Sequence, residues 1–65
     1  MNRKMKFLRH VAGCKECFVS MDSIPESAEI AETLLREGLI GVERKNGKII
    51  NVMITRLGLE RIRYS

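Results

Sequence analysis

The sequence predicts one small α+β domain, mainly helical, with the element order helix, short element, helix, β-hairpin, helix. Its 65 residues allow a single domain. Apolar residues recur at helical spacing in the N-terminal and central segments, and Asn46-Gly47 separates two runs rich in β-branched residues. Because a two-stranded hairpin cannot bury a hydrophobic face alone, we expect the helices to cover it.

The first helix is expected over residues 2–12. Asn2 is a suitable N-cap, and Gly13 follows where a C-terminal glycine is common. The expected apolar face consists of Met5, Phe7, Leu8, Val11 and Ala12. Arg3, Lys6, Arg9 and His10 occupy the other face.

A short element follows, because Phe18-Val19 predicts a brief strand or a buried loop. Ser20 is a suitable cap for a single helical turn over residues 21–24. Pro25 disfavours helix at the residue before it, so this turn is expected to be very short.

A second helix is expected over residues 25–37, with Pro25 at its first position and Gly38 at its end. Glu32 and Arg36 are spaced for an ion pair one turn apart. The expected apolar face consists of Ala28, Ile30, Ala31, Leu34 and Leu35.

The hairpin is expected over residues 39–55, because Asn-Gly suits a type I′ turn, which needs positive φ at both central residues. A terminal helix over residues 55–65 follows, with Thr55 as N-cap. Gly58 weakens a helix, so its presence there predicts close packing. The side chains expected to face inward are Leu57, Leu59 and Ile62.

The net charge of +4 is unevenly distributed. Residues 1–19 hold five cations and one carboxylate, residues 20–40 hold one cation and five carboxylates, and residues 41–65 hold six cations and two carboxylates. A basic balance favours polyanionic partners such as nucleic acid, contacted by the two basic ends. The longest uncharged stretch, 49–55, is too short for a membrane span, and we expect a cytoplasmic protein without a signal peptide.

Two phrases flank the hairpin: Leu34-x-x-x-Gly38-Leu39-Ile40 before it and Ile54-Thr55-x-x-Gly58 after it. In this order around an Asn-Gly hairpin, they resemble the second half of the winged helix-turn-helix family, over about residues 24–63. The resemblance implies duplex DNA binding by a transcriptional regulator, with one helix in the major groove and a hairpin wing on the backbone. The groove-facing positions would be Glu26, Ser27, Glu29, Thr33 and Arg36, and the wing positions Arg44, Lys45, Asn46 and Lys48.

Further phosphate contacts are expected from Lys6 and Arg9, which recur with Arg3 on one helix face. We also expect a homodimer, because a core this small benefits from oligomerisation and Leu59 and Tyr64 near the C-terminus suit such a contact.

The acidic helix 26–37 supports a different interpretation. Phosphate repels glutamate, so a helix rich in carboxylates suits a protein partner as well as a groove. A protein-interaction module is therefore an alternative to a DNA-binding protein.

Cys14-x-x-Cys17 is the one reactive-looking motif in the sequence. Its spacing suits half of a zinc site or a redox pair, but His10, Cys14 and Cys17 supply at most three ligands where zinc normally takes four. Three states remain open: two reduced thiols, a disulfide, or a metal site shared by two chains. No cofactor other than such a zinc ion is expected, and no spacing predicts an enzyme.

Overall fold

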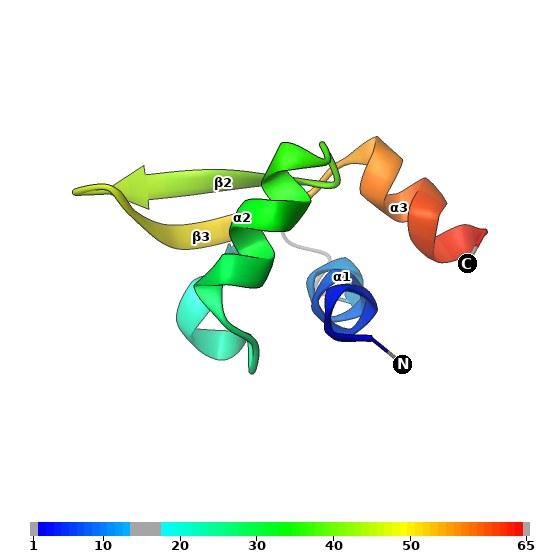
Figure 1. Cartoon of the computed structure of the whole chain (residues 1–65), viewed down its shortest axis with the longest axis horizontal. Coiled ribbons are helices and arrows are strands. Elements are labelled where there is room, and N and C mark those ends of the chain that lie inside the picture. The colour runs from blue at the N-terminus through cyan, green and yellow to red at the C-terminus, as the bar shows by residue number, and fades with distance from the viewer. Residues whose placement is uncertain (1, 14–17, 65) are drawn as a thin grey trace.

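The computed structural model describes residues 2–13 and 18–64. Its fold is α+β and mainly helical, as predicted, and its element order is compatible with a winged helix-turn-helix topology (Figure 1). Along the chain lie α1 (Arg3–Gly13), β1 (Val19–Ser20), the 3-10 turn η1 (Met21–Ser23), α2 (Ala28–Arg36), β2 (Ile40–Lys45), β3 (Lys48–Ile54) and α3 (Arg56–Arg63).

The three strands form one antiparallel sheet in the order β1-β3-β2. Val19 of β1 pairs with Val52 of β3. The short element predicted after the first helix is therefore a third strand, which lies beside β3 on the side away from β2. The predicted turn is confirmed, since Asn46 and Gly47 have φ of 54° and 78°. Positive φ at both central residues is the type I′ geometry, whose twist matches that of the flanking strands.

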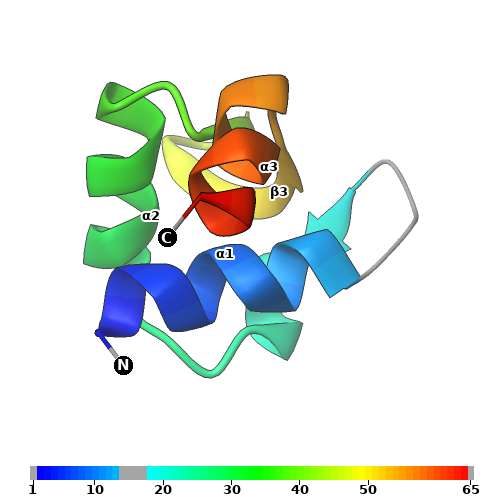
Figure 2. The same ribbon diagram turned by 90° about the vertical axis from the view of Figure 1, so that its right-hand side faces the viewer.

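One apolar core joins the helices to one face of the sheet. Helix α1 packs against α2, α3 and β3, and Figure 2 shows it running below both other helices. Asn2 caps α1 as predicted, because its side-chain oxygen accepts a hydrogen bond from the Met5 amide at 2.8 Å. The fully buried large side chains are Phe7, Leu8, Val11, Leu34, Leu39, Ile40 and Val52.

Helix α2 begins at Ala28, so the prediction of a helix from Pro25 was wrong. Ile24 is buried in an extended conformation, and Ser27 is extended too, with φ −77° and ψ 156°. The chain therefore passes from an anchored residue into the helix through Ser27 as N-cap. Ala28, expected on the apolar face, is exposed at the first position of the helix.

Gly38 ends α2 as predicted, with a left-handed φ of 79°. The Leu39 amide donates to the Leu34 carbonyl at 2.9 Å, and the Gly38 amide donates to the Leu35 carbonyl at 3.0 Å. These two bonds form a Schellman motif, which satisfies carbonyls that the helix leaves unpaired. Leu34 and Leu39 are both buried there, so the helix end also directs the chain into β2.

Thr55 joins the end of α2 to the start of α3. Its hydroxyl donates to the Gly38 carbonyl at 2.7 Å and accepts from the Gly58 amide at 3.1 Å, which confirms Thr55 as the N-cap. Its own amide donates to the Leu39 carbonyl at 3.2 Å. The two phrases that flank the hairpin in sequence therefore meet in space.

Helix α3 packs inward through Gly58 and Ile62, which lie one turn apart. The close packing predicted at Gly58 is confirmed, because a Cβ there would overlap the Leu39 carbonyl oxygen and lie 2.7 Å from Ile54 Cγ1. Leu57 and Leu59 were predicted to face inward, but they flank this line and are 48% and 47% exposed.

We expect Gly58→Ala to destabilise the fold. Overpacking typically costs about 1–3 kcal/mol. We expect the upper part of this range, because the obstructing atom belongs to the Leu39 backbone and cannot move aside easily. That cost outweighs the roughly 1 kcal/mol that alanine gains over glycine in a helix. Gly13→Ala is the control, since a Cβ at Gly13 meets nothing within 4 Å. Urea unfolding of both variants checks this, and equal midpoints would contradict the packing argument.

Candidate nucleic-acid interface

The hairpin tip, residues 43–48, is exposed at every position. Lys45 and Lys48 face each other directly across the strands, and Asn46 and Gly47 form the turn between them. Figure 1 shows the tip projecting away from the helices, at the end of the molecule opposite α3. The structure therefore places two predicted wing cations at an accessible extremity.

A β-bulge lies at the base of this tip. Glu43 pairs with Asn51 but Arg44 pairs with Ile49, so Ile50 is the extra residue on β3. A bulge increases the local twist and redirects the side chains beyond it. The Glu43 carboxylate accepts a hydrogen bond from the side-chain Nδ2 of Asn51 at 2.6 Å, whereas the Arg44 side chain extends to α2.

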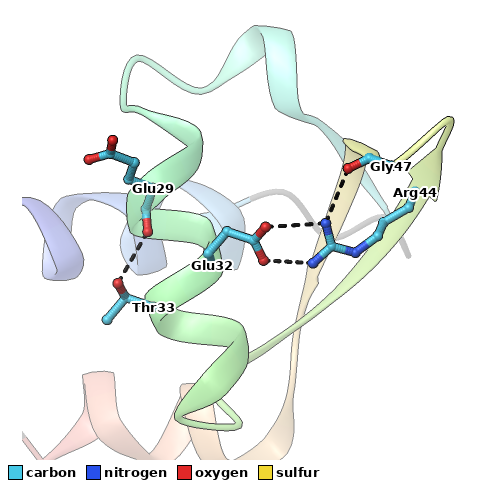
Figure 3. Close-up of polar contacts among 5 residues, drawn as sticks. All are labelled: Glu29, Glu32, Thr33, Arg44 and Gly47. Atoms are coloured by element: carbon cyan, nitrogen blue, oxygen red, sulfur yellow. Dashed lines mark hydrogen bonds and ion pairs between the residues drawn. The ribbon is translucent and has the colours of Figure 1, made fainter.

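Arg44 forms a two-pronged ion pair with Glu32 of α2. Its Nη2 lies 2.6 Å from Glu32 Oε1, and its Nη1 lies 3.2 Å from Glu32 Oε2 (Figure 3). Nη1 also lies 3.5 Å from the Gly47 carbonyl oxygen. These hydrogen bonds lower the pKa of Glu32 and raise that of Arg44, because each charge stabilises the other.

The predicted helical partner of Glu32 was Arg36, and the hydrogen-bonded partner is instead Arg44, twelve residues away. Arg36 still lowers the pKa of Glu32 through its charge, but less than Arg44 does. Packing of α2 against β2 brings Glu32 and Arg44 together, and no local spacing in the sequence marks that contact.

The polar face of α2 holds Glu29, Glu32, Thr33 and Arg36, which helical spacing places within one sector. Figure 3 shows Glu32 directed toward the hairpin and Glu29 directed away from it. Thr33 is half-buried, and its hydroxyl donates to the Glu29 carbonyl at 3.1 Å, while Arg36 is exposed. Of the other two residues predicted to face the groove, Ser27 is the N-cap and Glu26 precedes it outside the helix.

A second ion pair links α2 to α1. Lys4 Nζ lies 2.7 Å from Glu37 Oε2, just past the end of α2. Sequence reasoning missed this contact too, because the partners are 33 residues apart. Two carboxylates of the acidic segment therefore have cationic partners from other elements.

The basic face predicted on α1 is present, since Arg3, Lys6 and Arg9 are all exposed. Figure 1 shows the hairpin tip pointing away from α1, so the fold does not bring Lys6 and Arg9 beside Lys45 and Lys48. The two sets of cations form separate patches.

The remaining sequence predictions concern metals and membranes. Cys14 and Cys17 lie outside the described residues, and His10 is half-buried on α1. Within residues 2–13 and 18–64, no group of three or more His, Cys, Asp or Glu side chains is placed to hold a metal ion. None of the helices in those ranges has the length and apolar character that a bilayer crossing requires.

Comparison of this chain with protein-family models, curated proteins and solved structures gave no match.

We expect Glu32→Gln to reduce the loss of stability in acid. Folding lowers the pKa of Glu32 below its ordinary value of 4.5. The ion pair therefore stabilises the fold at pH values above 4.5, and this stabilisation is lost as the pH falls through the lowered pKa. The midpoint of urea unfolding, followed from about pH 7 to about pH 3, should fall further in the wild type than in the variant.

Glu29→Gln is the matched control, since the Glu29 side chain forms no ion pair within the described part of the chain. It should follow the wild type over the same pH range. Parallel curves for the wild type and Glu32→Gln would show that the ion pair does not form in solution.

Proposed function

We propose that this chain is a transcriptional regulator that binds duplex DNA, with the hairpin tip on the phosphate backbone and the polar face of α2 toward the major groove. The observation that carries the proposal is the direct cross-strand pairing of Lys45 with Lys48. Like charges placed opposite one another destabilise a hairpin. A polyanion between them would offset that repulsion, and both side chains are exposed to receive it.

The ion pairs reduce the main electrostatic objection to this proposal. Glu32 and Glu37 would repel phosphate if unpaired, but each is held by a cation, Arg44 or Lys4. The polar face of α2 and the tip together hold four cations and three carboxylates, and one of these carboxylates, Glu32, is paired with Arg44. The same pairs weaken the alternative in which α2 offers its carboxylates to a basic protein partner.

The phosphate contacts proposed from the structure are Lys45 and Lys48, with the Asn46 amide between them. Arg44 is occupied by Glu32 and contributes orientation rather than a direct contact. Lys6 and Arg9 belong to the separate α1 patch and would reach a different part of the duplex backbone.

We further propose that two copies associate through α3. This helix leaves Leu57 and Leu59 about half exposed and Tyr64 80% exposed. A two-fold dimer would present two hairpin tips to a pseudo-palindromic site.

Light scattering should give twice the mass of one chain for the wild type and a lower mass for Leu59→Glu. A wild-type monomer would overturn the association.

Replacing both tip lysines, Lys45→Gln with Lys48→Gln, should weaken binding to every duplex sequence to a similar degree. The slope of log affinity against log salt should fall in magnitude by about 1.8, because two phosphate contacts are removed. Fluorescence anisotropy of a labelled duplex over a salt series measures both quantities.

The control is Arg61→Gln with Arg63→Gln, which removes the same charge from the last turn of α3, at the opposite end of the molecule. Light scattering of this variant should give the wild-type mass, so that its binding reports on charge and not on association through α3. It should leave most of the slope intact. Equal losses in the two double variants would refute a specific role for the tip. A wild-type chain that binds no duplex at low salt would overturn the proposed function and favour the protein-interaction alternative.

A further inference from the structure

We propose that Glu32 is a positioning residue that determines how well the chain distinguishes one DNA site from another. It does so by holding Arg44, which orients the hairpin tip relative to α2 and withholds the Arg44 charge from phosphate. This inference rests on the proposed function.

The geometry of the contact restrains direction as well as distance. Both guanidinium nitrogens of Arg44 face both carboxylate oxygens of Glu32, at 2.6 and 3.2 Å. A planar two-pronged contact of this kind limits rotation, whereas a lysine ammonium would act as a point charge. Because Nη1 also lies 3.5 Å from the Gly47 carbonyl, the same guanidinium connects α2 to the turn of the hairpin.

The ion pair joins the side chains of the tip to the helices. Among the hydrogen bonds and ion pairs of residues 2–13 and 18–64, only the Glu32–Arg44 contact joins a tip side chain to a residue outside the hairpin. The tip itself is exposed throughout, and the nearest buried residue of the hairpin is Ile49. Removing the Glu32 carboxylate therefore removes this side-chain link, while the pairing of β2 with β3 and the core remain.

Neither stability nor affinity alone accounts for this arrangement. The partners are 39% and 45% exposed, and exposed ion pairs add little to stability. A released Arg44 would itself be a better phosphate ligand than either tip lysine. What the ion pair adds is a fixed relation between the phosphate contacts of the tip and the base-facing side chains of α2. Phosphate contacts position a protein on DNA, so a fixed relation favours duplexes whose bases match that position.

The test compares Glu32→Ala with Glu37→Ala. Glu37 is the matched control because it also ends at an exposed ion pair of α2, but its partner Lys4 lies on α1, away from the hairpin. Each variant and the wild type is titrated with a duplex selected from a randomised pool and with a scrambled duplex, over a salt series.

We expect Glu32→Ala to bind the scrambled duplex more tightly, with a salt slope steeper by about 0.9, because released Arg44 adds one phosphate contact. The ratio of the affinity for the selected duplex to that for the scrambled duplex should fall roughly tenfold. Glu37→Ala should keep the wild-type ratio. An unchanged ratio in Glu32→Ala, or an equal fall in both variants, would overturn the role of Glu32.

Amide hydrogen exchange of residues 43–48 provides a readout that does not depend on DNA. The tip should exchange faster in Glu32→Ala than in Glu37→Ala, and equal rates would show that the ion pair does not orient it. A wild-type chain that binds neither duplex overturns the proposed function and this inference with it, whereas wild-type binding with an unchanged ratio in Glu32→Ala overturns this inference alone.

Discussion

The hydroxyl of Thr55 is the contact on which the arrangement of the molecule most depends. It donates to the Gly38 carbonyl at the end of α2 and accepts from the Gly58 amide in the first turn of α3. One hydroxyl group thus hydrogen-bonds both to the residue that ends α2 and to the first turn of α3, at the point where β3 ends. The hairpin leaves and returns to this junction, so its base is set by a polar contact as well as by the surrounding apolar core.

This junction gives a physical reason for the spacing of the two phrases that resemble a winged helix-turn-helix domain. Gly38 supplies the left-handed φ that turns the chain out of α2, and Gly58 leaves room for the Leu39 carbonyl. Gly38 is needed for its own backbone conformation, whereas Gly58 is needed because the Leu39 backbone passes close to α3. Two separated motifs in the sequence are therefore two halves of one contact.

Two ion pairs within the molecule involve carboxylates of the acidic α2 segment. The acidic α2 segment is flanked by elements that supply Arg44 from the hairpin and Lys4 from α1. Internal pairing leaves Lys45 and Lys48 as exposed cations at the tip. Two carboxylates of the acidic region are thus paired within the fold, which is consistent with the proposed use of the tip lysines.

Local signals predicted most of the fold. The type I′ turn at Asn46-Gly47 and the helix end at Gly38 follow from backbone conformations that few other residues adopt, and the Thr55 cap follows from side-chain chemistry. The predicted start of α2 was wrong because Ile24 is buried in an extended conformation, so the helix begins only at Ala28. This is a tertiary effect that the position of proline in the sequence does not indicate. The sequence identified the cations of the candidate site but not the contact that one of them makes. The Glu32–Arg44 ion pair forms because α2 packs against β2, and the spacing of residues in the sequence does not indicate that packing.

The exposure of the whole hairpin tip has a consequence for how this fold can diverge. Residues 43–48 add little to the core, and the type I′ turn constrains only Asn46 and Gly47 by backbone conformation. Substitutions at the flanking positions therefore alter surface charge at low cost in folding, whereas the junction at the hairpin base depends on three particular residues, Gly38, Thr55 and Gly58. A chain of this fold can therefore change the charge at its hairpin tip through a few substitutions, while the helices and the base of the sheet stay the same.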